Sequence, residues 1–276
     1  MAPERRLSST SPARLRRAID FVSSMKDRSA QRQVPFEWGT ALFNDDFPRV
    51  HDMNFLRIEN APEDVTPEAL AEEADRLLDG FKHRVLELDD QALGDRLTPG
   101  FKELGWEVVN LLFMEAKREP DRQLAPGVAR EVDLEDHLHV RDRSLRQDPE
   151  IEQDEEVIRQ LRDCFRVWSV AGNMRQFAAF VDGEPVSSCE LYSDGETGQI
   201  EGVLTLEEHR NRGLGIAIVL LALQEAKRAG HDMIFLIAED DDWPKELYTK
   251  LGFDPIGRTH EFKISDVSKI GQPKDS

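Results

Sequence analysis

Apolar residues recur along this chain with two spacings, one typical of helices and one typical of strands. In the first half, residues 12–28 and 66–80 carry the helical spacing. The second of these segments has a threonine cap, a proline in its first turn and a closing glycine. Apolar runs typical of strands occur at 37–43, 53–58, 85–88 and 108–114. A further helix is expected between the last two of these runs.

The second half repeats this order of elements. Helices are predicted near 132–144 and 153–165, from a glycine-rich turn to Ala229, and at 244–251. Strands are predicted at 177–181, 186–192, 200–206, 233–238 and 255–264, and the turn signal Asp182-Gly183 joins the first two. The charged segment 115–127 carries two prolines and separates the halves. The pattern therefore predicts domains at 1–122 and 128–265, followed by a polar tail at 266–276.

Two short sequences suggest that the halves are copies of one unit. "FKELGW" at 101–106 and "YTKLGF" at 248–253 share Leu-Gly and both flanking aromatic positions, and each follows a short apolar strand that ends in acidic residues. The copies differ ahead of their first long helix. The first copy has "ENAPEDVTPE" there, without glycine, and its acidic residues Glu59, Glu63 and Asp64 would repel an anion.

Composition and charge limit the classes of protein to which the chain can belong. The formal net charge of −19 over 276 residues disfavours a nucleic acid as the main partner, because a polyanion would be repelled. No apolar run reaches the roughly 20 residues that a membrane-spanning helix needs, and the charged start MAPERRLSSTSPARL lacks the apolar core of a secretory signal. Cys164 and Cys189 stand apart with no neighbouring histidine, which disfavours a disulfide framework and a zinc site. We expect a cytoplasmic protein with no metal and no membrane partner.

The stretch "HRNRGLGIAIV" at 209–219 carries the clearest chemical signal. Gly213 and Gly215 allow the backbone to approach a ligand closely, and free N–H groups at a helix start attract anions. Arg210 and Arg212 add positive charge. A dinucleotide-binding turn is the competing interpretation, but Ile218 stands where that turn would need its third glycine or alanine. The stretch is therefore predicted to bind a phosphate group.

These residues resemble a known family. "VLTLEEHRNRGLGIAIV" is similar to the acetyl-CoA-binding motif of the GNAT superfamily of N-acyltransferases, and "LYTKLGF" at 247–253 resembles the family's second motif. The resemblance covers residues 128–265 and reaches the first half through the repeat. It implies an α+β GNAT fold, with a mixed, mostly antiparallel sheet flanked by helices, in two tandem copies of which the first is degenerate.

The resemblance also implies how the acyl donor, acetyl-CoA, is held. The strand residues should lend backbone groups to the pantetheine and the thioester carbonyl, and N–H groups of the turn should hold the pyrophosphate. The implied strand residues are Val203, Leu204 and Thr205, and the implied turn residues are Arg210, Asn211, Arg212, Gly213, Leu214, Gly215 and Ile216. No metal is implied.

The resemblance implies two catalytic groups. Tyr248 stands where the family often places a general acid that protonates the departing thiolate. Glu201 is the candidate base that receives the acceptor's proton, because it shares strand parity with Val203 and Thr205 and should point to the same face. Glu190 in the neighbouring strand and a chain of water molecules are alternatives for the base.

Several other positions are interpreted more simply. Asp241 stands where the family often has an asparagine that contacts the cofactor, and an ionised acid cannot donate that hydrogen bond. His137 and His139 are expected on the surface of a polar helix. The acidic run at 148–156 could select a cationic amine, although a solvated acidic helix is the simpler interpretation.

Two functions therefore stand. The first is transfer of an acyl group from acetyl-CoA to a primary amine, on a small molecule or a protein, by direct attack in a ternary complex. The second is a non-catalytic acyl-CoA-binding module that acts as a sensor or scaffold. The sequence leaves open the acceptor, the acyl length and the oligomeric state, a homodimer among the alternatives.

Overall fold

The computed structural model describes residues 11–125, 127–149 and 151–267. Its contacts form two compact units. The large unit holds the residues up to Met25, Phe113–Ala238 and Asp242–Ile256, and the small unit holds Lys26–Leu112, Glu239–Asp241 and the residues from Gly257 onward. The boundary between the units falls inside four regular elements, and the predicted domain limits of 1–122 and 128–265 stay a prediction. Most of the predicted polar tail at 266–276 lies outside the described residues.

The small unit is a mixed sheet with two helices. Its strands lie in the order β1-β2-β3-β4-β11, and β3 and β4 are parallel while the other neighbours are antiparallel. The elements are β1 (Arg32–Phe36), β2 (Gly39–Phe43), β3 (Phe55–Ile58), α2 (Pro67–Leu77), β4 (Arg84–Leu88), α3 (Gln91–Glu103) and β11 (Phe253–Ile264), with a short 3₁₀ turn at His51–Met53. The apolar faces of α2 and α3 cover a core that includes Leu70, Leu97 and Phe101.

The last strand of the chain completes this first-half sheet. His260 of β11 lies opposite Leu88 of β4, and Ile264 lies opposite Arg84. The ring of Phe262 stacks on Phe101 with 4.2 Å between centroids. The final strand of the second copy therefore supplies part of the core of the first.

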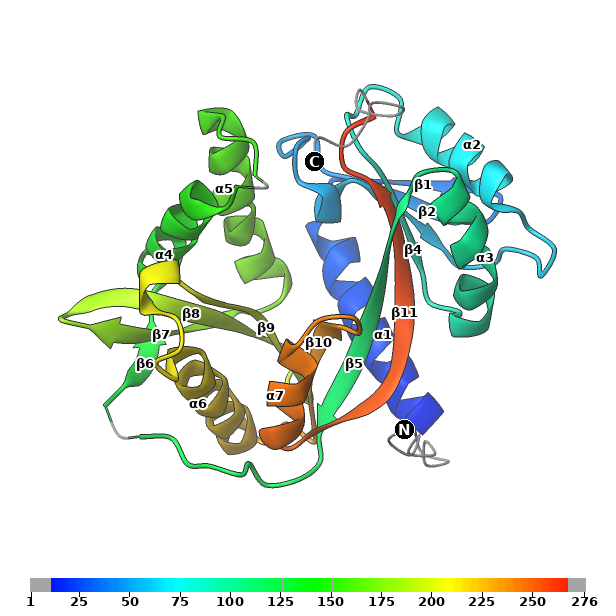
Figure 1. Ribbon diagram of the computed structural model, residues 1–276. Coiled ribbons are helices and arrows are strands. Elements are labelled where there is room, and N and C mark those ends of the chain that lie inside the picture. Colours follow the sequence, from blue (N-terminus) through cyan, green and yellow to red (C-terminus); the bar gives the residue numbers. More distant parts are fainter. Residues whose placement is uncertain (1–10, 126, 150, 268–276) are drawn as a thin grey trace. The chain divides into compact units, whose positions relative to one another are not determined.

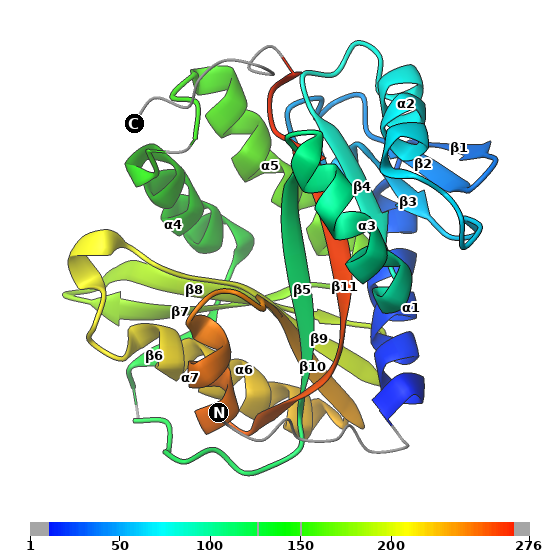
Figure 2. The ribbon, with the colours of Figure 1, turned by 45° about the vertical axis from the view of Figure 1, so that its right-hand side comes forward.

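The large unit contains the second copy. Its strands lie in the order β10-β9-β8-β7-β6, and only the β10–β9 pair among these is parallel. The elements are β6 (Ala129–Val132), α4 (Leu134–Gln147), α5 (Glu155–Ala171), β7 (Arg175–Val181), β8 (Glu184–Ser193), β9 (Thr197–Thr205), a 3₁₀ turn at Glu207–His209, α6 (Leu214–Ala229), β10 (Met233–Glu239) and α7 (Pro244–Lys250); β5 (Glu107–Ala116) ends in this unit. Helix α6 covers one face of the sheet, and α4 and α5 cover the other (Figure 1 and Figure 2).

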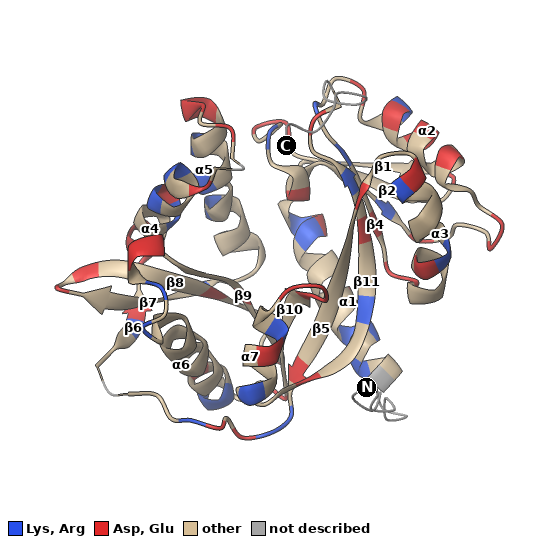
Figure 3. Ribbon diagram, viewed as in Figure 1, with Lys and Arg blue, Asp and Glu red and all other residues tan. Residues whose placement is uncertain are grey.

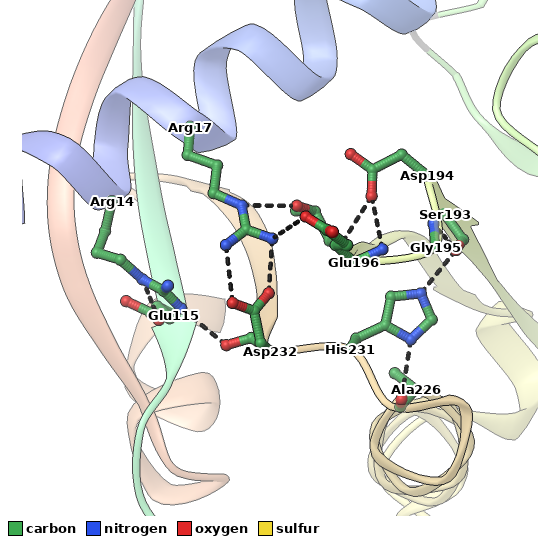
Figure 4. A network of polar contacts seen from close by, with 11 residues as sticks. Arg14, Arg17, Glu115, Ser193, Asp194, Gly195, Glu196, Ala226, His231 and Asp232 are labelled. Atoms are coloured by element: carbon green, nitrogen blue, oxygen red, sulfur yellow. Dashed lines mark hydrogen bonds and ion pairs between the residues drawn. The ribbon is translucent and has the colours of Figure 1, made fainter.

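The first helix, α1 (Ser11–Ser29), is fastened to the large unit by arginines of its N-terminal half. Arg17 pairs with Asp232 through both of its terminal nitrogens, at 2.6 and 3.0 Å, and its Nε donates to Thr197 Oγ1 at 2.9 Å. Arg14 pairs with the buried Glu115 (Figure 4). These contacts fix the N-terminal half of α1 beside the start of β9, at the end far from the glycine-rich turn.

The two repeat motifs adopt the same local structure. Gly105 and Gly252 have φ angles of +80° and +92°, and each follows a leucine that ends its helix, α3 or α7. A glycine in this left-handed conformation is the common way to end a helix. Within each motif the first aromatic ring packs near the last, at 5.1 Å for Phe101–Trp106 and 6.3 Å for Tyr248–Phe253. The duplication predicted from the sequence is therefore visible in the structure.

The predicted helices and strands are all present, with ends that differ by a few residues. Two strands were not predicted, β1 and β6. Both are short strands at the edges of their sheets, and β1 contains Pro35, which weakens any strand signal. In the part of the chain that the structure describes, no helix has the length and apolar character to span a membrane.

The place of β11 can be tested at Gly94 in the middle of α3. A Cβ at Gly94 would lie 2.1 Å from Nδ1 of the buried His260 ring. Glycine to alanine usually stabilises a helix, but here we expect Gly94→Ala to lower the free energy of unfolding by about 1–3 kcal/mol because the core is overpacked. Urea denaturation of the full chain measures the effect.

The control for this test is the double variant Gly94→Ala/His260→Ala. Removing the ring removes the clash, so alanine at position 94 should be neutral or stabilising in the His260→Ala background. An equal effect of Gly94→Ala in both backgrounds would show that β11 does not lie against α3.

Candidate functional site

The glycine-rich turn forms an uncapped helix start. Asn211 and Gly213 have φ angles of +60° and +77°, and Gly213 is the N-cap residue of α6. No described side chain accepts a hydrogen bond from the first turn of this helix. Because the first N–H groups of a helix have no partner within it, the donors from Leu214 onward point out of the helix end. Arg210 differs, since its N–H donates to the carbonyl of Glu207 at 3.1 Å.

Two arginines of this turn lack acidic partners. Nε of Arg210 donates to the carbonyl of Thr205 at 3.2 Å, and Arg212 lies 3.0 Å from Nδ1 of His209. Most other arginines of the chain pair with a carboxylate, whereas these two have none among the described residues. An uncapped helix start beside two cations without acidic partners can bind an anion.

The corresponding helix start in the first copy is closed. Thr66 caps α2, where its Oγ1 accepts a hydrogen bond from the N–H of Ala69 at 3.3 Å. The preceding loop carries the acidic residues that the sequence indicated, and Glu59 among them pairs with Arg57. The two copies therefore share a fold but differ in the chemistry of this helix start.

Strand β9 continues beyond the end of its pairing with β10, toward the glycine-rich turn. It pairs with β10 from Thr197 to Ile200, opposite Met233 to Leu236, and then continues to Thr205. On its other side β9 pairs with β8, but the register shifts between the pairs Glu190–Glu201 and Ser188–Leu204. Gly202 lies at this bulge with a φ angle of +60°.

The bulge places Glu201 on a different face of the sheet from the one predicted. Opposed residues of antiparallel strands share a face, so Glu201 lies on the face of Glu190 and Ser188. Thr205 lies on the other face, opposite Ser187, whose Oγ is 2.8 Å from Thr205 Oγ1. The expectation that Glu201 points to the same face as Val203 and Thr205 is therefore wrong, because a bulge inserts one residue and reverses the alternation.

The three strand residues expected to meet the acyl donor lie beside α6. A Cβ at Gly215 would lie 3.4 Å from Thr205 Oγ1 and 3.9 Å from Val203 Cγ1, so the first turn of α6 faces these two side chains. The carbonyl of Leu204 accepts a hydrogen bond from Ser187 at 2.7 Å. The structure thus brings the glycine-rich turn and the free end of β9 together.

A buried ion cluster lies on the α4 face of β8 and β9. The side chain of Glu190 is fully buried, and its Oε1 lies 2.8 Å from a terminal nitrogen of Arg141 and 3.0 Å from Nε2 of His137. Burial raises the pKa of Glu190, but Arg141 and His137 outweigh it, so the net pKa is lowered. The guanidinium of Arg141 also lies over the ring of Phe165, 4.2 Å from its centroid. Glu190 is therefore held ionised.

The pKa of Glu201 is raised, whereas that of Glu190 is lowered. Burial, and then the charge of Glu190, raise the pKa of Glu201 to about 7. Its Oε2 accepts a hydrogen bond from Nε2 of Gln199 at 2.7 Å. The carboxyl therefore exchanges its proton near neutral pH, as a general base must.

Tyr248 lies within electrostatic range of Glu201. Burial raises the pKa of its hydroxyl, and the charge of Glu201 raises it further. The side chain is 9% exposed, on α7 of the large unit. The hydroxyl therefore keeps its proton at all physiological pH values and can act only as a donor in that range.

The remaining residues interpreted from the sequence have simpler roles. Asp241 accepts a hydrogen bond from Asn110 at 3.4 Å. In the acidic run, Asp154 caps α5, Glu155 pairs with Arg146 and Glu156 pairs with Arg159. Figure 3 shows acidic and basic residues interspersed on α4 and α5. These three acids are thus engaged in structure, as the simpler interpretation expected. Cys164 and Cys189 are buried, and neither forms a disulfide within the described residues.

Three residues of the site were not found from the sequence. His137 is fully buried, so the expectation that it lies on the surface is wrong, whereas His139 is exposed as expected. His137 and Arg141 are four positions apart on α4 and so share one face of the helix. That spacing, and an isolated glycine at 202 within a strand pattern, were the available signals.

Part of the chain matches a known protein family. Residues 138–253, less than half of the chain, match the model of the acetyltransferase (GNAT) family. No functionally curated protein matches the chain.

Solved structures show a similar fold over most of the chain. A protein of unknown function from Staphylococcus epidermidis has a TM-score of 0.63 at 16% identity, over 86% of this chain and 94% of that one. A GCN5-related N-acetyltransferase from Kribbella flavida has a TM-score of 0.56 at 19% identity, over 91% and 95%. A tandem GNAT protein from the clavulanic acid biosynthesis pathway has a TM-score of 0.53 at 12% identity, over 94% and 96%. Residues 138–253 therefore match the GNAT acetyltransferase family, and the chain has the fold of a tandem GNAT protein.

Proposed function

We propose that the protein transfers the acetyl group of acetyl-CoA to a primary amine, by direct attack of the amine on the thioester while both substrates are bound. Acyl-CoA-dependent acetyl transfer is the general activity of the family that residues 138–253 match. One observation carries the finer proposal. Glu201, with a pKa of about 7, and the protonated Tyr248 lie within electrostatic range of each other where β9 continues past β10.

The glycine-rich turn fits the diphosphate of CoA. Its uncapped N–H groups begin at Leu214, and Arg210 and Arg212 supply positive charge with no acidic partner among the described residues. Because the N–H of Arg210 already bonds to Glu207, this arginine contributes through its charge and through the shape of the turn. Val203, Leu204 and Thr205 lie beside the same turn and would receive the pantetheine.

The two proton transfers would be divided between two residues. An amine must lose a proton to form the amide, and the carboxylate of Glu201 would receive it. A base with a pKa near the operating pH is well suited to this task. The hydroxyl of Tyr248 would donate to the sulfur that leaves. Glu190 cannot act as the base, because it is fully buried and both of its partners stabilise its ionised form.

A non-catalytic acyl-CoA-binding module is the second candidate. The open helix start alone would serve such a module, and the acceptor, a small molecule or a protein amino group, is not identified by the described residues. A binding module has no use for a carboxyl that titrates near pH 7 beside a buried tyrosine. This pair supports the enzyme.

The open helix start can be tested at Gly215. Valine there would place methyl groups between the first turn of α6 and the side chains of Thr205 and Val203. We expect the parent to bind one acetyl-CoA per chain, because Thr66 closes the equivalent site, and we expect Gly215→Val to weaken binding at least about 100-fold. Isothermal titration calorimetry measures both. Ile216→Val, in the same turn, is the matched control and should bind normally. Two equivalent sites in the parent, or full affinity in a folded Gly215→Val protein, would contradict the assignment.

The role of Tyr248 can be separated from its packing. Tyr248→Phe keeps the ring against Phe253 and removes the hydroxyl, so stability and CoA affinity should change little while kcat falls by about 10²-fold. Thr249→Val removes a neighbouring hydroxyl that bonds to the carbonyl of Lys245, and should leave kcat unchanged. Release of CoA with a panel of amines supplies the rate. A Tyr248→Phe enzyme as fast as the parent would assign the aromatic ring a packing role only.

The pH dependence of transfer reports on Glu201. The base works when ionised, so kcat/KM should be high above pH 7 and decline as the pH falls through about 7. Glu201→Gln should lose this acidic limb and most of the activity, and keep its affinity for CoA. A limb near pH 7 that persists in Glu201→Gln would show that another group, such as the acceptor amine, is being titrated.

A further inference from the structure

Glu190 is paired on one side only. Its Oε1 accepts a hydrogen bond from Arg141 at 2.8 Å and lies 3.0 Å from Nε2 of His137, whereas its Oε2 has no hydrogen-bond partner among the residues that the structure describes. A Cβ at Gly202 would lie only 2.0 Å from Oε2, so this unpaired oxygen rests on the backbone of β9 at the bulge. A terminal nitrogen of Arg141 would lie 2.2 Å from the same Cβ, so the carboxylate and the guanidinium both lie beside the strand that carries Glu201.

The sheet makes Glu190 and Glu201 direct neighbours across two strands. Glu190 and Glu201 are directly opposed in the antiparallel register of β8 and β9, on the same face. Opposed residues have Cβ atoms about 4.5–5.5 Å apart. Two like charges at such a separation in a buried place cannot both form without cost. Arg141 and His137 decide which one is ionised, because they touch Glu190.

We propose that Glu190, anchored by Arg141 and His137, is a positioning residue that makes Glu201 the group to which the acceptor's proton goes. This inference rests on the proposed role of Glu201 as the base. The cluster would not touch either substrate. It would act through the fixed negative charge that it holds beside Glu201.

Titratable groups from three elements surround Glu201 and Glu190 in the described part of the chain. Helix α4 supplies His137 and Arg141, β8 supplies Glu190 and Tyr192, and α7 supplies Tyr248. Burial and Glu190 raise the pKa of Glu201, and Arg141 lowers it by a smaller amount. The two tyrosines stay neutral because burial and the nearby carboxylates raise their pKa values. Glu190 is thus the neighbouring charge with the largest effect on Glu201.

A direct titration tests the proposal without an acceptor. Glutamate labelled with ¹³C at Cδ gives a carboxyl signal for Glu201, identified by its loss in Glu201→Gln. Its midpoint in the parent should lie near pH 7. In Glu190→Gln, where the amide keeps the shape of the side chain, the midpoint should fall by about one pH unit or more. Arg141→Lys keeps the charge and is the matched control, with a midpoint close to that of the parent.

The double variant Glu190→Gln/Arg141→Gln covers the case in which a lone buried arginine prevents folding. It removes both charges, and its midpoint should also fall, by a smaller amount. A folded single or double variant whose Glu201 midpoint stays near pH 7 would overturn the proposal. If the midpoint moves while the acidic limb of kcat/KM does not, the positioning role of Glu190 stands and the role of Glu201 as base is wrong.

Discussion

The geometry of the candidate site depends on one bulge in β9. Gly202 adopts a φ angle of +60° that residues with a Cβ seldom adopt, and its missing side chain is the space in which the Glu190 carboxylate lies. The bulge places Glu201 on the α4 face and Thr205 on the α6 face of the same short segment. One strand can therefore serve a cofactor on one side and an acceptor on the other. Any side chain at 202 would disturb both the strand and the ion cluster.

The tandem fold shows how two copies with the same order of elements can differ in function. Helix α2 follows β3 in the first copy and α6 follows β9 in the second, but a threonine side chain caps the start of α2 and no described side chain caps the start of α6. The first copy keeps the aromatic ring of Phe101 where the second has Tyr248, and that ring stacks on Phe262 of the final strand. The ring of Phe101 therefore packs against the strand that completes the sheet of the first copy.

Local chemistry explains what could be predicted from the sequence. Caps, turns and apolar spacing are properties of neighbouring residues, and so the helices, most strands and the open helix start of α6 were predicted close to their observed places. The pairing of β11 with β4 joins residues far apart in the chain, and no local pattern encodes it. The bulge reverses the alternation of side chains along β9, so the face of the sheet predicted for Glu201 was wrong. His137 looked like a surface residue because its helix is polar, and only the acid on a distant strand shows why it is buried.

The ion cluster also bears on the choice between an enzyme and a binding module. The pKa of Glu201 is raised from 4.5 to about 7, so the folded state binds this proton more tightly than the unfolded state does. The stability that follows is present at low pH and is lost as the pH rises toward and through 7, where the carboxylate forms inside the protein. At neutral pH the fold thus carries a buried carboxyl that a glutamine would replace without this cost. A scaffold has no reason to keep such a group opposite another carboxylate. The role as a base that we propose for Glu201 would account for this cost, because such a base must accept a proton near pH 7.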